Sequence, residues 1–438
     1  MILSKDKKFN QFVIGQAFSQ IGEHMSRVSL AWLVFKLAGN GNAVFGLSVL
    51  AVLQALPPLL FGWLYGILID SVHSKKNLLF YADLMRGIFF CLIPLFYWFH
   101  ILDFPLFYIL IFCSATFSGL FGPAMFSMLP EFSPEAGSLL YRNSVVNVTG
   151  HVGVLIGPLV GGLLAFLFPA GLVVFVTGTT FLISAWIIWN IVGQRLSLET
   201  IKYHARELTD LFLKAGKLLL GTLSKHGFNN HITENIFYSI RLGGAPKLFC
   251  IMAFVVGVAS GPINVLLPIY VKKTLNGGPF LLGVILSVAG VGMLTASLVL
   301  SKLKHSFGVV YSHRAFIPKQ EVILMASIFV SGLLLIPTGL FHNAIEGAGL
   351  LFFSVGLGDL FSPIMHTEIQ AMVPQKQSGR VLTSIGSFFL LGILLGILVT
   401  PSVVGLSGVF GAFIFIGFVR VMAGLLPLLL RTAAEYIN

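Results

Sequence analysis

Two acidic residues, Glu23 and Asp359, stand deep inside long apolar stretches of the sequence. Glu23 lies about 16 Å into the stretch 12–36 if that stretch is helical, and Asp359 lies about 18 Å into the stretch 347–369. A charge at such a depth costs roughly 2.5–3.5 kcal/mol to insert into a bilayer, which makes each residue a candidate functional group. Neighbouring groups readily tune the protonation of a carboxyl in such a site, which suits proton exchange against a solute.

Other polar residues in the apolar stretches are candidates to act with these acids. Arg27 follows Glu23 by four residues on the same helical face, so an internal pair is expected, and the pair either works or only neutralises itself. Asn264, beside Gly261 and Pro262, is a candidate polar wall of a solute cavity. Together with Asp359, these residues form the predicted substrate-binding or proton-binding set.

Three more charged residues, Asp83, Arg86 and Arg420, lie inside apolar stretches. Asp83 and Arg86 are expected to pair with each other near the cytoplasmic end of their stretch, in a structural role. Arg420 either snorkels toward the membrane interface or marks an earlier end of the last stretch.

Composition shows what kind of element must position these residues. The 438 residues are 56% hydrophobic and 10% charged, with a mean hydropathy of +0.94, whereas soluble domains carry about 25% charged residues. In lipid only helix bundles and closed barrels satisfy the backbone, and the apolar runs here are about twice the length of a barrel strand. The three cysteines lie in these runs and are expected to pack as small hydrophobic residues. The sequence predicts an all-α membrane protein.

Twelve membrane-spanning helices are expected, in two sets of six. The first set is 12–36, 43–69, 78–99, 105–129, 144–168 and 171–193. The second set is 248–270, 280–303, 322–341, 347–369, 379–401 and 408–430. The predicted domains are therefore an N-terminal half, 1–193, a basic linker with an amphipathic helix, 194–247, and a C-terminal half, 248–438.

The basic residues predict the orientation in the membrane. Twenty-one Lys and Arg residues fall in the terminal tails and the connections on one side, three fall in the connections on the other side, and three lie within spans. By the positive-inside rule both termini and the linker are cytoplasmic, in an inner (plasma) membrane. The net charge of +11 is spread over loops, which argues against a nucleic-acid partner.

Two motifs support a family resemblance. The connection after the second span, from Gly66 to Lys76, reads Gly-Ile-Leu-Ile-Asp-Ser-Val-His-Ser-Lys-Lys. It resembles the loop signature of the major facilitator superfamily, Gly-x-Leu-Ala-Asp-Arg-x-Gly-Arg-Lys, with both arginines replaced by serine. Gly66 would let two helices approach closely, and Asp70, with Lys75 and Lys76, would form a conformational latch between the halves.

The second motif lies in the fifth span and consists of Gly153, Gly157, Pro158, Gly161 and Gly162. It resembles the antiporter-associated motif of the same superfamily, in which small residues permit tight helix packing and the proline adds a kink. Generic packing of small residues is the alternative interpretation. Together with the connections between spans four and five and between spans ten and eleven, the motifs resemble bacterial drug and siderophore exporters of the macrolide-efflux and enterobactin-exporter group.

The resemblance implies a transporter whose spans one, four, seven and ten line a central cavity, so that Glu23 and Asp359 would face it from the two halves. Many proton-coupled members carry an arginine in the fourth span, but residues 112–128 contain no charge. Proton coupling would therefore use other groups.

The predicted function is proton-coupled efflux of small amphiphilic compounds, of drug or siderophore type, by alternating access. An importer or lysolipid carrier of the same fold and a non-transporting receptor remain alternatives, because fold does not determine function. No metal-ligand set, nucleophile elbow or phosphate-binding glycine loop is evident, so neither an enzyme nor a metal or cofactor is expected. The expected partners are a small-molecule substrate, protons and the lipid bilayer, and the expected state is a monomer.

Overall fold

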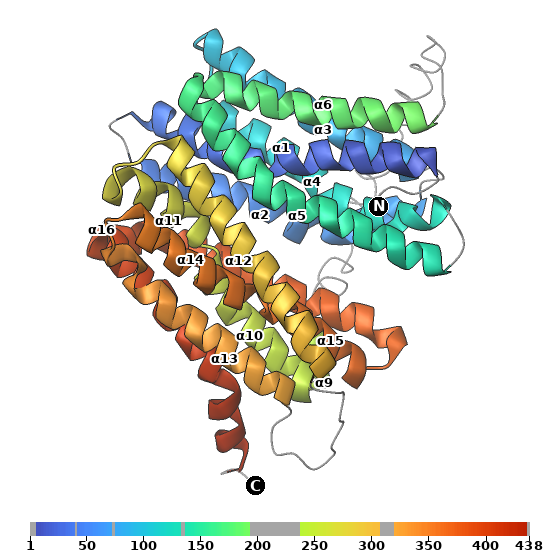
Figure 1. Ribbon diagram of the computed structural model, residues 1–438, viewed down its shortest axis with the longest axis vertical. Coiled ribbons are helices and arrows are strands. Elements are labelled where there is room, and N and C mark those ends of the chain that lie inside the picture. Colours follow the sequence, from blue (N-terminus) through green and yellow to red (C-terminus); the bar gives the residue numbers. More distant parts are fainter. Residues whose placement is uncertain are drawn as a thin grey trace, which may run out of the picture. The chain divides into compact units, whose positions relative to one another are not determined.

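The computed structural model describes residues 6–39, 42–71, 75–132, 136–192, 237–306 and 319–435 (Figure 1). Every regular element in these ranges is a helix. Large apolar side chains such as Leu406 and Ile345 are 90% and 81% exposed, as expected of a surface that faces lipid rather than water. The predicted all-α membrane fold is confirmed.

Seven elements precede the linker region. They are α1 (Lys7–Ala38), α2 (Ala43–Ser71), α3 (Lys75–Trp98), α4 (Phe104–Met128), the short η1 (Leu129–Phe132), α5 (Ala136–Leu167) and α6 (Ala170–Val192). Asp103 caps α4 by accepting a hydrogen bond from the backbone N–H of Leu106 at 2.9 Å, which places the start of this helix one residue from the predicted one.

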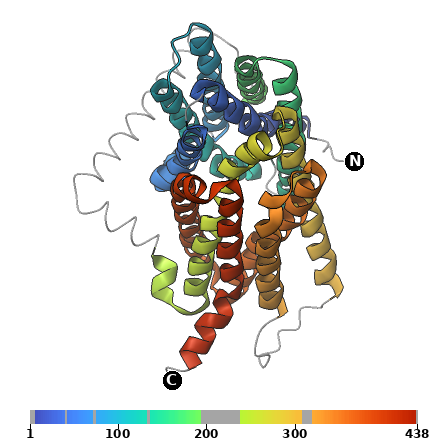
Figure 2. The ribbon, with the colours of Figure 1, turned by 90° about the vertical axis from the view of Figure 1, so that its left-hand side faces the viewer.

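Ten described elements lie from residue 237 onward, and the first two of them begin within the predicted linker, 194–247. They are α9 (Tyr238–Leu242), α10 (Gly244–Ser260), α11 (Ile263–Ile269), the π-helical η2 (Tyr270–Thr274), α12 (Pro279–Ser306), α13 (Lys319–Leu335), the 3₁₀ turn η3 (Ile336–Leu340), α14 (Ala344–Asp359), α15 (Phe361–Met372) and α16 (Gln375–Glu435). Figure 2 shows this part of the chain in colours from yellow-green to red. Gly261 and Pro262 separate α10 from α11, and α14 stops at Asp359.

The count of twelve spans is only partly confirmed. Within the described ranges, ten helical stretches are long and apolar enough to cross a membrane. One of them, Gln377–Leu428, has 52 residues and is broken at Gly408, where φ is 71°; at 1.5 Å per residue it is long enough for two crossings. Helix α1 is not among the ten because polar residues interrupt its apolar character, Glu23 and Arg27 included.

Contacts divide the chain into two compact units. The first unit takes in most of the predicted N-terminal half, and the second takes in the predicted C-terminal half together with Val34–Val52 and Pro158–Phe166. The domain boundaries drawn from the sequence stay a prediction, and the amphipathic linker helix expected within 194–247 lies almost wholly outside the described residues.

Each unit has its own apolar core, which holds the polar residues in place. In the first unit, Phe9, Leu79, Phe121 and Val146 are buried among the helices that precede the linker. In the second unit, Phe249, Ile328, Ile369 and Val381 are buried together, from α10, α13, α15 and α16. A charged group enclosed by such a core costs free energy unless it is paired and hydrogen-bonded.

Candidate functional site

Glu23 of α1 is bound by an arginine of another helix. Its carboxylate forms an ion pair with Arg86 of α3 and accepts a hydrogen bond from the hydroxyl of Ser118 of α4 at 3.3 Å. The partner predicted from helical spacing was Arg27, and that prediction was wrong. Arg27 is exposed and, within the described ranges, makes no ion pair within 4 Å. Three helices therefore meet at Glu23.

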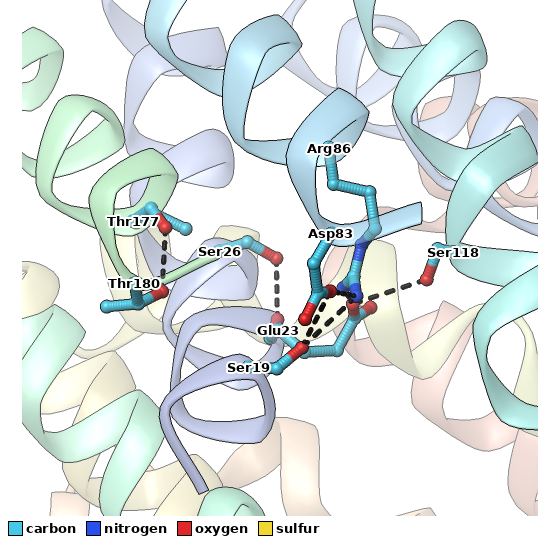
Figure 3. A network of polar contacts seen from close by, with 8 residues as sticks. All are labelled: Ser19, Glu23, Ser26, Asp83, Arg86, Ser118, Thr177 and Thr180. Atoms are coloured by element: carbon cyan, nitrogen blue, oxygen red, sulfur yellow. Dashed lines mark hydrogen bonds and ion pairs between the residues drawn. The ribbon is translucent and has the colours of Figure 1, made fainter. Parts of the chain in front are cut away.

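Arg86 also binds a second carboxylate (Figure 3). Its Nη1 lies 3.0 Å from Oδ1 of Asp83 and donates a hydrogen bond of 3.3 Å to Ser19 of α1. Ser19 in turn donates to Asp83 at 3.0 Å. The expected pairing of Asp83 with Arg86 is confirmed, but the pair extends across α1 and α3 because Arg86 reaches Glu23 as well.

Aromatic rings pack against Arg86 at the buried end of the cluster. The guanidinium lies 4.0 Å from the ring centroid of Phe181 of α6 and 5.6 Å from that of Phe121 of α4, which stabilises the cation. The side chain of Arg86 is 4% exposed, that of Asp83 0% and that of Glu23 41%. One end of the cluster is therefore buried and the other is open.

The cluster, defined as Glu23, Asp83, Arg86, Ser19 and Ser118, contains two carboxylates and one guanidinium. Oδ2 of Asp83 is buried and has no hydrogen-bond partner in the described part of the chain. Two carboxylates that share one cation carry a net negative charge when both are ionised, and one bound proton removes it. Among these five residues, the two carboxylates outnumber the one guanidinium.

Sequence reasoning missed Arg86, Asp83 and the two serines as members of the site of Glu23. The signal was present, since Asp83 and Arg86 are charged residues three positions apart in an apolar stretch. Periodicity along a single helix cannot tell which helix stands opposite. The fourth span, which has no arginine, supplies Ser118, and the arginine comes from the third span instead.

The glycines of α5 lie at two helix contacts. A Cβ added to Gly153 would come within 2.7 Å of Cβ of Gln20 in α1, and one added to Gly157 would come within 2.8 Å of the carbonyl of Ile21. Any larger residue would push α1 away from α5. Gln20 and Ile21 lie two to three residues before Glu23, so this contact brings α5 against the part of α1 that carries the carboxylate.

The rest of the motif makes its contact within the second unit. A Cβ at Gly162 would lie 2.7 Å from the carbonyl of Pro279 and 3.0 Å from Cα of Gly283 in α12. Gly283 has no room for a side chain against the carbonyl of Pro158. Gly161 is buried in the same turn.

The predicted latch is described only in part. The side chain of Asp70 lies outside the described residues. Lys75 donates a 3.3 Å hydrogen bond to the carbonyl of Ser127, at the end of α4, and Lys76 lies 5.3 Å from the ring centroid of Phe132. No described atom lies within 4 Å of a Cβ built on Gly66, so the close helix contact expected there is not seen. The latch stays a prediction.

The second unit holds the other predicted site residues. Asn264 is exposed near the start of α11, just after the break at Gly261 and Pro262. Asp359 is half-buried at the end of α14. Neither prediction of a substrate-binding role is tested by these positions, and both remain predictions.

Both roles predicted for Arg420 were wrong. It neither snorkels nor ends its helix: α16 continues to Glu435, and Arg420 is only 5% exposed. Its Nη1 donates to the hydroxyl of Ser331 in α13, and its Nη2 donates to the hydroxyl of Ser260 in α10, both at 2.9 Å. The second unit therefore contains a buried arginine of its own.

The helical membrane fold and the charged groups buried within it define a polytopic membrane transporter, and comparison with known proteins identifies its family. The family model for the Major Facilitator Superfamily matches residues 12–317. The chain belongs to the Major Facilitator Superfamily of membrane transporters.

Two relatives illustrate its place in the family. The chain is 24% identical to the uncharacterized MFS-type transporter YfiS of Bacillus subtilis (strain 168), over 99% of this chain and 95% of that protein. It is 27% identical to the multidrug resistance protein MdtG of Enterobacter lignolyticus (strain SCF1), over 64% of this chain and 61% of that protein.

Solved structures share the fold at low sequence identity. A mutant of the peptide transporter POT, crystallised with alafosfalin, has a TM-score of 0.73 at 14% identity, covering 98% of this chain and 95% of that one. A POT family transporter in complex with 5-aminolevulinic acid has a TM-score of 0.68 at 14% identity, covering 96% and 95%. At this identity the likeness concerns the fold alone.

Proposed function

We propose that this transporter exports small amphiphilic compounds in exchange for protons, by alternating access, in the inner (plasma) membrane with both termini in the cytoplasm. The observation that carries the proposal is the cluster in which Glu23 and Asp83 share Arg86. The relatives named for multidrug resistance support drug-type compounds as the transported class.

The charges of the cluster explain why a proton would bind there. With both carboxylates ionised, Glu23 and Asp83 outnumber the one guanidinium that pairs with them, and binding of one proton balances these three groups. Arg27 and His24 of α1 also act on the charge of Glu23. Glu23 is the entry point because its side chain is 41% exposed, whereas that of Asp83 is fully buried.

Protonation of Glu23 would couple to helix packing. The Glu23 carboxylate links α1 to Arg86 of α3 and to Ser118 of α4. A neutral Glu23 is no longer attracted to Arg86. Arg86 then keeps Asp83 as its ion-pair partner, at 3.0 Å. Contact between α1 and its neighbours is then weakened, and the equilibrium between the two access states shifts by the free energy of the lost pair.

The test uses Glu23→Gln, which keeps the size of the side chain and removes its titration. Purified protein in vesicles with an acidic lumen should accumulate the amphiphile 8-anilinonaphthalene-1-sulfonate against its gradient. We expect Glu23→Gln to abolish this accumulation while downhill exchange of the same compound continues. The matched control is Glu346→Gln, because Glu346 is exposed in the first turn of α14 and should behave as wild type.

Retained proton-driven accumulation in Glu23→Gln would exclude Glu23 as the coupling site. The alternatives predict different movements of the compound. An importer that moves compound and protons together would carry the compound out of the acidic lumen. A lysolipid carrier would move lysolipid without a proton gradient, and a non-transporting receptor would move neither compound. The direction of accumulation therefore separates the proposed function from each alternative.

A further inference from the structure

The surroundings of Arg420 differ from those of an ordinary buried arginine. Its partners are two serine hydroxyls, and no carboxylate oxygen of the described residues lies within 4 Å of its guanidinium. Arg420 lies about 18 Å along the helix from the break at Gly408, so its burial is deep. A buried cation without an anion is unstable unless something supplies the negative charge.

One edge of the guanidinium is left incomplete. The Nε of Arg420 is buried and has no hydrogen-bond partner within the described ranges. Nε and Nη2 form one edge of the planar group, the edge that binds the two oxygens of a carboxylate or related oxyanion. On this edge Nη2 already meets Ser260, whose hydroxyl accepts the bond and retains its own proton to donate.

The guanidinium of Arg420 packs against a residue without a side chain, Gly358. A Cβ at Gly358 of α14 would lie 3.0 Å from Nη1 of Arg420 and 3.0 Å from Oγ of Ser331. Ser331 donates to the carbonyl of Ser354 at 2.7 Å, so its hydroxyl is oriented to accept from Arg420. The guanidinium is therefore held by α13 and α14 on one side, while its Nε edge is turned toward α10.

Ser260, which contacts that edge, is the last residue of α10 and is half-buried. The chain breaks there at Gly261 and Pro262, and the next polar residue, Asn264 near the start of α11, is exposed. The edge of Arg420 that carries Nε therefore lies against the end of a helix and not against its middle.

We propose that Arg420 and Ser260 bind an anionic oxygen group, a carboxylate or sulfonate, carried by the transported compound. This proposal rests on the proposed function, and it means that the transported compounds are amphiphiles with an acidic headgroup. Arg420 supplies the charge, and Ser260 supplies a hydrogen bond.

The test measures equilibrium binding by wild-type protein in detergent, without a membrane or a pH gradient. The probes are 1-naphthoate and its neutral analogue 1-naphthamide, with inorganic sulfate as a free anion. Binding is detected as a rise in the unfolding temperature, followed with a thiol-reactive fluorophore on Cys91, Cys113 and Cys250, which are free and at least partly buried. We expect naphthoate to raise the unfolding temperature more than naphthamide does.

Arg420→Met should remove the difference between the two probes, with naphthoate bound roughly tenfold to a hundredfold more weakly, as expected for loss of hydrogen bonds to a charged group. Without ligand, Arg420→Met should unfold at the same or a higher temperature than wild type, because it removes an unneutralised charge and Ser331 keeps its bond to Ser354. Ser260→Ala should weaken the binding of naphthoate and leave the binding of naphthamide unchanged.

Equal shifts by naphthoate and naphthamide in wild type would overturn the proposal. So would an Arg420→Met variant that is destabilised but keeps its preference for naphthoate, since Arg420 would then be structural. If sulfate alone gives the full shift and naphthoate adds nothing, the site binds free anions and the assignment to the transported compound fails. Failure of proton coupling leaves these binding results unchanged, because Glu23→Gln should still bind naphthoate.

Discussion

Arg86 of the first unit and Arg420 of the second are both buried, and they differ in their partners. Arg86 in the first unit lies between Glu23 and Asp83. Arg420 in the second unit has two serine hydroxyls as partners, and among the described residues its Nε has none. The pairs of Arg86 contain more acid than base, which suits the proposed uptake of a proton, whereas no described carboxylate lies within 4 Å of Arg420.

The difference shows that burial of a charged residue does not by itself indicate its role. An arginine that neutralises internal acids is part of the architecture, because its removal leaves two carboxylates without their cation. An arginine held only by hydroxyls can be removed without leaving a charge behind. Substitution by methionine, which has a similar length, should therefore have opposite effects at the two positions.

The largest expected effect follows replacement of Arg86. Arg86→Met leaves Glu23 and Asp83 without their cation and should lower stability by about 3–5 kcal/mol, seen as poor expression and a lower unfolding temperature. The triple variant Glu23→Gln, Asp83→Asn, Arg86→Met removes all three charges and should recover most of the loss. If Arg86→Met is as stable as Arg420→Met, the contrast between the two arginines is wrong.

A smaller effect is expected from filling the space next to Arg420. Gly358→Ala places a methyl group 3.0 Å from Nη1 of Arg420 and Oγ of Ser331, and should destabilise by about 1–3 kcal/mol and weaken naphthoate binding. Gly386→Ala is the control, since nothing lies within 4 Å of a Cβ there and alanine favours a helix. Thermal unfolding and naphthoate titration of both variants test whether Arg420 needs this gap.

The smallest expected effect concerns Asp359, next to Gly358 in α14. Its half-buried carboxylate should attract cationic compounds and repel anionic ones, so Asp359→Asn should weaken binding of 1-naphthylmethylammonium and strengthen binding of 1-naphthoate. At roughly 0.2–1 kcal/mol for a partly exposed charge, each change is at most about fivefold. Equal changes for 1-naphthamide would mean that Asp359 acts on the shape of the site and not on its charge.

Much of the fold could be predicted from the sequence because lipid imposes strong constraints. Apolar runs of about twenty residues require helices, and the predicted starts of the second and fourth helices fall within one residue of those observed. The count of twelve spans differs from the ten apolar stretches observed at two places. Helix α1 is too polar to be included, and the last two predicted spans form one helix that is broken only at Gly408. Glu23 was identified as a candidate from its depth alone, but the partner chosen for it was wrong.

The sequence by itself determined the helical membrane fold and the presence of charges deep within it, because hydropathy is a property of each segment alone. Only the tertiary structure decided which charges meet. Arg86 reaches Glu23 across two helices, and Arg420 reaches Ser260 and Ser331 from α16, 160 and 89 positions apart in the chain. Helical spacing reports neighbours three or four residues away on one helix, whereas packing between helices brings together side chains at any separation.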